Sequence, residues 1–178
     1  MYNCMCTAGI RILLVLFSLT FIIGCSQEFK EVGNMKLTSP AFENGKEIPA
    51  EYTCDGDNVN PELGIADIPS DAKSLALIMD DPDAPAGIFD HWVVFNIPAV
   101  SKISKNSVPE GALQGKNSFG KNNYGGPCPP SGTHRYVFKL YALDIELNLD
   151  ENADKKAIEK AMQGHILAQT QLIGIYSR

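Results

Sequence analysis

The chain has 178 residues, with 21 acidic and 15 basic side chains and a formal net charge of −6 at pH 7. This balance argues against a general nucleic-acid binder, and against attachment to anionic membranes by charge, because phosphates and anionic lipids attract basic surfaces. The length allows one well-buried domain behind an N-terminal leader.

The first 24 residues are predicted to be an export signal and not part of the fold. Arg11 precedes "ILLVLFSLTFII", an uncharged apolar run that leads into "GCSQ". A basic residue, a short apolar core and a small residue at the cleavage site are typical of a signal peptide. The run is too short for a transmembrane helix, which needs about 20 apolar residues.

The end of the run, "IIGC", resembles the lipobox of bacterial lipoproteins, which implies cleavage before Cys25 and acylation of its thiol. The alternative is an ordinary cleaved signal peptide. On the lipoprotein interpretation, residues 1–24 are the signal, 25–35 are a polar lipidated tether and 36–178 are the domain. The protein is then expected in the bacterial cell envelope, attached to the membrane only through the Cys25 lipid. This mature chain has 21 acidic and 14 basic residues, a net charge of −7.

Two cysteines remain in the predicted domain, Cys54 and Cys128, in a compartment where disulfides form. The sequence leaves open whether they are bridged. A bridge requires that their Cα atoms lie within about 7 Å. Their spacing does not fit a zinc cluster.

Three apolar runs dominate the domain: "SLALIM" (74–79), "HWVVFNI" (91–97) and "YVFKLYAL" (136–143). Each is rich in β-branched or aromatic residues and is bounded by Asp, Pro or Gly, which is typical of buried strands. Shorter strands are predicted at 35–39 and 172–177. These runs indicate a mainly β fold.

One helical segment is predicted over residues 153–171, where apolar residues recur at a spacing of 3.6. Asn152 or Asp154 caps its start, and Gly164 is expected to divide it into two pieces. Strands followed by a single helical patch predict a β fold with short C-terminal helices on one side. The absence of βαβ alternation argues against a nucleotide-binding parallel sheet.

Two of the three histidines open predicted strands, His91 before "WVVFNI" and His134 before "RYVFKL". The loop "DDPDAPAGIFD" (80–90) precedes the first of them, and its prolines end the strand and stiffen the turn. A carboxylate beside an imidazole orients the ring and favours its charged form. We therefore expect Asp81 to orient a cationic His91 or His134 that attracts an anion.

The segment "GGPCPPSG" (125–132) is a second rigid loop, directly before His134. Glycine permits close approach of the backbone to a ligand, and proline has no N–H to donate. The N–H groups around Gly126, Cys128 and Ser131 are predicted to form a small anion nest. Tyr136 adds a hydroxyl donor on the strand face of His134. The loop is interpreted as a preformed wall beside a charged histidine.

Other chemistries have weaker support. Asp81, Asp83 and His91 are metal-type ligands, but no motif fixes their arrangement, and we expect no metal and no cofactor. Ser131 near His134 imitates a Ser–His pair, but the chain has no G-x-S-x-G elbow. A hydrolase that uses Asp81 with either histidine is therefore the least favoured hypothesis, and a strand-end histidine is often an ordinary surface residue. A binding protein is favoured over an enzyme.

Four motifs, in order, resemble the phosphatidylethanolamine-binding protein family, and most closely its bacterial Raf-kinase-inhibitor-like branch of YbhB/YbcL type. They are "DPDAP" (81–85), "HWVVFNIP" (91–98), "GPCPPSGTHRY" (126–136) and "GHILAQTQLIGIYSR" (164–178). The similarity covers about residues 36–178. It implies a Greek-key β-sandwich of two antiparallel sheets, and a small preformed pocket for phosphate, phosphorylated head groups or other anions.

The resemblance also assigns the residues of this pocket. They are the acid Asp81, its rim Asp83, Ala84 and Pro85, the histidines His91 and His134, the wall Gly126, Pro127, Cys128, Pro129 and Pro130, and Tyr136. A helix somewhere in 154–170 is expected to gate the pocket. Phe89 occupies a rim position that is often Trp in the family, so the lip of the pocket is expected to differ.

Family membership alone does not fix the function, because one fold supports many functions. Relatives bind lipid head groups, inhibit kinases or proteases, or regulate development. The first hypothesis is a lipoprotein that binds a small anionic or phosphorylated ligand. The alternative is a protein-interaction or inhibitor module that uses an exposed apolar pocket rim against an unidentified protein partner.

Overall fold

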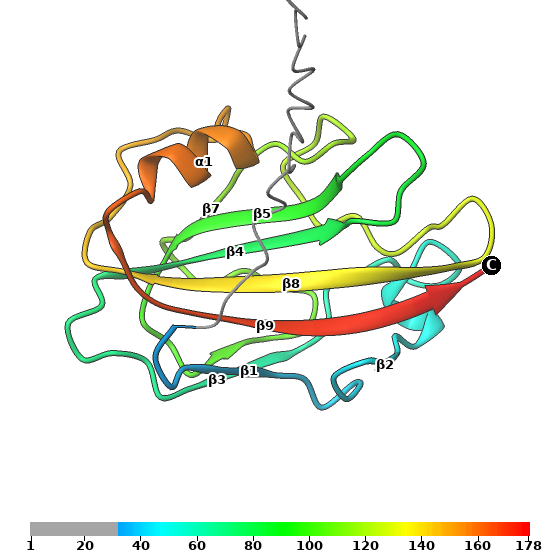
Figure 1. Cartoon of the computed structure of the whole chain (residues 1–178), viewed down its shortest axis with the longest axis horizontal. Coiled ribbons are helices and arrows are strands. Elements are labelled where there is room, and N and C mark those ends of the chain that lie inside the picture. The colour runs from blue at the N-terminus through cyan, green and yellow to red at the C-terminus, as the bar shows by residue number, and fades with distance from the viewer. Residues whose placement is uncertain (1–31) are drawn as a thin grey trace, which may run out of the picture.

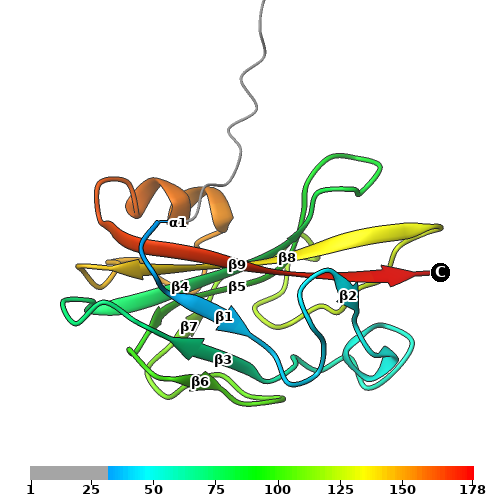
Figure 2. The same ribbon diagram turned by 60° about the horizontal axis from the view of Figure 1, so that its bottom comes forward.

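The computed structural model describes residues 32–178, which form two stacked sheets and one short α-helix. Cys25 and the predicted signal peptide lie outside the described residues. Within residues 32–178, the small sheet has the strand order β1-β3-β6 and the large sheet the order β2-β9-β8-β4-β5-β7. Figures 1 and 2 show the large sheet between the small sheet on one side and α1 on the other. The elements are β1 (Lys36–Thr38), β2 (Lys46–Glu47), a 3-10 turn (Ala50–Tyr52), β3 (Leu63–Ala66), β4 (Ser74–Asp81), β5 (Phe89–Ile97), β6 (Lys102–Ile103), β7 (Leu113–Gln114), β8 (Thr133–Leu143), α1 (Lys155–Ala161) and β9 (Ile166–Ser177).

The three apolar runs are confirmed as the central strands β4, β5 and β8. Every residue of β4 is buried, because both faces of the sheet are covered at this strand. Leu75, Leu77 and Met79 belong to the core between the sheets, whereas Ala76 and Ile78 belong to the core beneath α1. Full burial of a large apolar side chain stabilises a fold by about 1.5–3 kcal/mol, so this two-sided packing fixes the strand register.

The predicted helix is correct only in its first half. Helix α1 begins after Asp154, whose side chain accepts a hydrogen bond from the N–H of Ala157 at 2.9 Å, and ends at Ala161. Gly164 then adopts φ +81°, and residues 166–171 belong to strand β9. This strand pairs with β8 along its whole length, from Ile166 opposite Leu143 to Ser177 opposite Thr133. Pairing with a central strand overrides the helical spacing of these residues.

Two further details differ from expectation. Strand β2 pairs in parallel with β9, so the large sheet is not wholly antiparallel. The end of the predicted tether belongs to the domain, because Val32 exchanges two backbone hydrogen bonds with Gln169 and Met35 is 4% exposed in the core. Within residues 32–178, no helix is long and apolar enough to cross a membrane.

Candidate functional site

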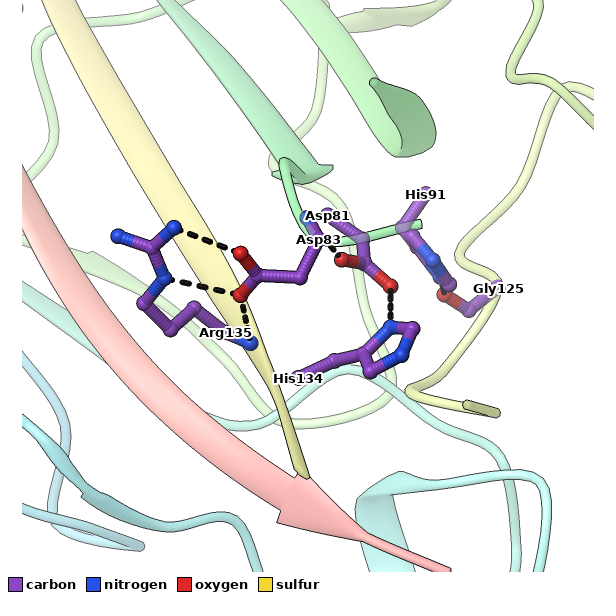
Figure 3. Close-up of polar contacts among 6 residues, drawn as sticks. All are labelled: Asp81, Asp83, His91, Gly125, His134 and Arg135. Carbon is purple, nitrogen blue, oxygen red and sulfur yellow. Dashed lines mark hydrogen bonds and ion pairs between the residues drawn. The ribbon is translucent and has the colours of Figure 1, made fainter. Parts of the chain in front are cut away.

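Three strand ends meet at one edge of the large sheet. Strand β4 ends at Asp81, and its antiparallel neighbours β5 and β8 begin there, at Phe89 and Thr133. Antiparallel pairing therefore brings the loops 82–88 and 118–132 to the same place as both strand-end histidines. Figure 3 shows the polar contacts that result.

Asp81 and His134 form a buried pair. The Nδ1 of His134 lies 2.7 Å from Oδ2 of Asp81, and the two side chains are 9% and 4% exposed. A carboxylate only accepts hydrogen bonds, so Nδ1 carries the hydrogen. The other oxygen, Oδ1, accepts the backbone N–H of Asp83 at 2.8 Å. Within the described residues, Nε2 of His134 makes no hydrogen bond.

A bulge in β5 turns His91 toward this pair. Trp92 lies opposite Met79 and Asp90 lies opposite Asp80, so His91 is an extra residue without a partner on β4. The side chain of Asp90 therefore pairs with Lys155, the first residue of α1, at 3.1 Å. The side chain of His91 packs on the opposite side of the sheet. A bulge commonly re-aims a side chain in this way beside a functional site.

His91 is fixed by Gly125. Its Nδ1 donates to the carbonyl oxygen of Gly125 at 2.8 Å, and its own carbonyl accepts the N–H of Gly125 at 3.0 Å. Burial lowers the pKa of His91, although the Gly125 carbonyl and the Asp81 charge act in the opposite direction. The expectation that Asp81 orients a histidine is met by His134, whereas His91 is held toward its neutral form with Nε2 as an acceptor.

Tyr136 contacts His91 and lies two residues after His134, on the same face of β8. Its ring packs edge-on against His91, with centroids 5.1 Å apart, on the strand face expected from its spacing. Its hydroxyl is buried and makes no hydrogen bond within the described residues. Burial, together with the nearby charge of Asp81, raises the pKa of Tyr136, so the phenol stays protonated and can donate.

The Gly/Pro segment contributes lining residues to the cavities described below, and one N–H group of the predicted anion nest is already engaged. The N–H of Gly126 donates to Oδ1 of Asn58 at 2.7 Å, so it is not available to an anion. A Cβ atom at Gly126 would lie 2.5 Å from the carbonyl oxygen of Tyr52, so this position requires glycine. The wall is therefore fastened to the loop 52–58.

A disulfide joins the same two segments. Cys54 and Cys128 are bonded, with Cα atoms 5.5 Å apart, which answers the question that the sequence left open. The N–H of Cys54 also donates to the carbonyl of Pro127 at 3.1 Å. The early loop and the wall are thus linked both covalently and by backbone hydrogen bonds.

Two cavities flank this wall. The first has a volume of about 250 Å³ and the second about 170 Å³, and they share Phe119 and Cys128. The first is lined by Asp81, Ala84, Pro85, Phe89, His91, Phe119, Cys128 and Pro130. The second is lined by Cys54, Asn58, Phe119, Lys121, Asn123, Tyr124, Gly125, Gly126 and Cys128. The first cavity is lined by six of the twelve predicted site residues: Asp81, Ala84, Pro85, His91, Cys128 and Pro130.

Other predicted residues lie outside its lining. Asp83 turns away and binds Arg135, with Oδ1 and Oδ2 at 2.6 and 2.8 Å from the guanidinium (Figure 3). This contact lowers the pKa of Asp83 to about 2, so the residue anchors the rim loop to β8. Pro127, Pro129, His134 and Tyr136 line neither cavity, and the expected gating helix contributes no lining residue from 154–170.

Phe119, which lines both cavities, was not among the residues predicted from the sequence. Its side chain is 48% exposed and packs edge-on against Phe89 and His91, with centroids 4.8 and 5.6 Å apart. An isolated aromatic residue in the polar segment "NSFGKNN" was the available signal. Ile88, which precedes the lining residue Phe89 in the chain, is a second exposed apolar side chain, at 60%.

Comparisons with known proteins find a matching family model and similar sequences and structures. Residues 38–177 match the family model described as phosphatidylethanolamine-binding protein. A UPF0098 protein of Methanothermobacter thermautotrophicus is 49% identical over 150 residues, which cover 81% of this chain and 99% of that protein. One from Aquifex aeolicus is 49% identical over 152 residues, covering 81% and 89%.

Two solved structures are similar along their whole length. The putative phosphatidylethanolamine-binding protein homolog CT736 of Chlamydia trachomatis has a TM-score of 0.78 and 42% identity, covering 81% of this chain and 97% of that one. Escherichia coli YbcL, described as a new member of the mammalian PEBP family, has a TM-score of 0.77 and 30% identity, covering 82% and 99%.

Proposed function

Because this chain belongs to the phosphatidylethanolamine-binding protein family, we propose that it binds a small anion, either phosphate or the phosphate of a larger head group, in the cavity beside Asp81 and His91. The observation that carries the proposal is the pair of buried imidazoles. Each has Nδ1 bonded to the protein and Nε2 without a hydrogen-bond partner among the described residues. His91 lines the cavity itself, and His134 is joined to it through its partner Asp81, which is a lining residue.

The affinity for an anion should depend on the protonation of the cavity histidine and of the anion. None of the residues that line the cavity is Lys or Arg, and the chain has a net charge of −6. An imidazolium donates through Nε2, whereas a neutral ring with its hydrogen on Nδ1 can only accept there. Burial disfavours the charged form of His91, so an anion must bring a proton to this ring or carry one itself. Affinity should therefore fall as the pH rises.

Titration calorimetry of the full chain tests the proposal, with phosphate, phosphoethanolamine and sulfate. We expect binding at about pH 6 that weakens at least about tenfold by pH 8, as uptake of one proton requires. Sulfate does not titrate in this range, so its pH dependence reports the protein alone. His91→Ala and His134→Ala should each lose binding.

His165→Ala is the matched control. His165 pairs with Asp144 at 2.8 Å, at the other end of β8, and is 41% exposed in its side chain. This variant should bind like the wild type. The proposal is wrong if the folded wild-type chain binds none of the three anions at either pH, or if binding survives both cavity substitutions.

The exposed rim favours a second candidate, a protein-interaction module. Phe119 is 48% exposed and lines the cavity together with Pro85 and Pro130, and Ile88, which precedes the lining residue Phe89 in the chain, is 60% exposed. An exposed apolar patch is a common feature of protein-binding surfaces. Partner capture should then be lost in Ile88→Ser/Phe119→Ser and kept in His91→Ala. The reverse pattern would contradict this candidate.

We also propose that the protein is an exported lipoprotein acylated at Cys25. The "IIGC" motif and the disulfide support this, since disulfides persist in oxidising compartments. Metabolic labelling with a radioactive fatty acid should mark the wild type and not Cys25→Ser. Equal labelling of both would contradict acylation at this position.

A further inference from the structure

We propose that the Cys54–Cys128 disulfide is a site of thiol–disulfide exchange, at which an external dithiol reduces the bond and leaves the Cys128 thiolate in the cavity wall. The bond joins residues 74 positions apart, yet it does not lie in the core. Both cysteines are exposed, and both line the second cavity. Cys128 also lines the first cavity, so a dissolved thiol can reach the bond from a preformed hollow.

A guanidinium faces the two sulfur atoms. Nη1 of Arg178 lies 3.3 Å from Sγ of Cys128 and 3.8 Å from Sγ of Cys54. The backbone of Arg178 exchanges two hydrogen bonds with Gly132, at 2.8 and 3.1 Å, so the last residue of the chain is held beside the wall. A cation next to sulfur stabilises the thiolate, which is the form that leaves and reacts in exchange.

Two other charged groups, Asp55 and Lys121, lie near the disulfide. Asp55 pairs with Nε of Arg178 at 3.2 Å and accepts the hydroxyl hydrogen of Tyr176 at 2.8 Å. It therefore orients the guanidinium from the side away from Nη1. Lys121, which lines the second cavity, adds another positive charge. Structural disulfides are commonly buried, whereas exposed ones are more readily exchanged.

The position of Arg178 sets the direction of the reaction. The reagent thiolate attacks Sγ of Cys54, the S–S bond breaks, and its electron pair leaves on Sγ of Cys128, the sulfur nearer to the guanidinium. The second thiol of the reagent then attacks the reagent sulfur of the mixed disulfide and releases Cys54 as a thiolate. The dithiol is oxidised to a cyclic disulfide, and the protein gains two electrons. The two protons pass to solvent or to the cysteines.

Reduction should leave the fold in place. The wall remains fastened by the Gly126 N–H on Asn58, by the Cys54 N–H on Pro127 and by the Tyr124 hydroxyl on the Tyr52 carbonyl at 2.8 Å. What changes is charge, because a thiolate adds one negative charge to the wall of the first cavity. An anion in that cavity should then bind more weakly. This last consequence rests on the proposed function, whereas the exchange itself does not.

Timed reduction of the full chain by dithiothreitol, followed by alkylation and peptide mass spectrometry, tests the exchange. We expect Cys54 and Cys128 to be alkylated without denaturant. Arg178→Gln should slow this by about tenfold or more, and Arg178→Lys should recover much of the rate. The matched control is Lys102→Gln, which removes an exposed cation paired with Glu62 at 3.3 Å, and its rate should stay within about twofold of the wild type.

A second readout fixes the direction. With glutathione, a monothiol, the trapped mixed disulfide should be on the peptide that contains Cys54. Alkylation that requires denaturant, equal rates in Arg178→Gln and the wild type, or glutathione on Cys128 would each overturn the proposal. Phosphate titration of the oxidised and reduced protein then tests the consequence. Equal phosphate affinity of the two forms would show that reduction of the disulfide does not affect anion binding, and would leave the exchange itself standing. No phosphate binding in either form would count against the proposed function.

Discussion

Asp80 and Asp81 are neighbours in the chain and face opposite sides of the large sheet. Asp81 bonds to His134 at the cavity, whereas Asp80 is fully buried and holds Lys139 and Lys155 at 2.7 and 2.8 Å beneath α1. The alternation of strand side chains puts two carboxylates of one strand end to different uses. One fixes the imidazole of His134, and the other connects the helix to the opposite side of the same strand end.

Lys155→Gln should therefore lower stability and leave ligand binding intact. Burial alone would lower the pKa of Lys155, but the carboxylates of Asp80 and Asp90 outweigh it, so the pKa is raised and the lysine stays charged. Removal of the charge leaves Asp90 without this partner and Asp80 with one cation, a loss of about 1–3 kcal/mol in the free energy of unfolding. Urea unfolding measures this loss. Lys156→Gln, at an exposed neighbouring position, should change stability little, and an equal effect in both variants would refute the interpretation.

Asp81→Asn should weaken phosphate binding by about tenfold or more at pH 6. The amide keeps the shape of the side chain, but it removes the charge that fixes the Nδ1–H of His134. Titration calorimetry reports the affinity, and circular dichroism checks the fold. Asp57→Asn, at an exposed position in the early loop, is the control. Equal affinities for both variants and the wild type would exclude Asp81 from the site.

His91 should make the protein less stable in mild acid. Its pKa is lowered by burial, while in the unfolded chain an imidazole titrates near about 6.5, so the unfolded state binds more protons below that pH. The free energy of unfolding is unaffected above about pH 6.5, falls as the pH drops below it, and levels off below the folded pKa. The free energy of unfolding can be measured by urea unfolding at several values between about pH 5 and pH 8. It should depend less steeply on pH in His91→Gln than in His165→Gln. Identical slopes would contradict the account.

Gly126→Ala should destabilise the domain by about 1–3 kcal/mol, because its Cβ atom would meet two fixed oxygen atoms. These are the carbonyl of Tyr52 at 2.5 Å and Oδ1 of Asn58 at 2.6 Å. Gly120→Ala is a useful comparison, since that position has open space and only its φ of +73° opposes alanine. Chemical denaturation of both variants tests the prediction. A smaller loss at position 126 than at position 120 would show that the wall adapts.

The resemblance and the loop pattern identified much of the candidate site from the sequence. The motifs that contain Asp81, His91 and His134 lie at strand ends that meet, as expected. The roles of the two histidines were not readable, because His91 faces the cavity through a bulge and His134 alone contacts Asp81. A bulge depends on the register between strands, and no local pattern in "FDHWVV" records it.

The sequence by itself determined the buried strands, a helix start capped by Asn152 or Asp154, an interruption at Gly164 and the loops that carry the polar residues. These features depend on side-chain chemistry within a few neighbouring residues. Only the tertiary structure decided that residues 166–171 form a strand, that Gly126 donates to Asn58, that Phe119 separates two cavities, and that Arg178 faces the disulfide. Each of these depends on partners far away in the chain, and hydrogen bonding and packing against such partners outweigh local propensity.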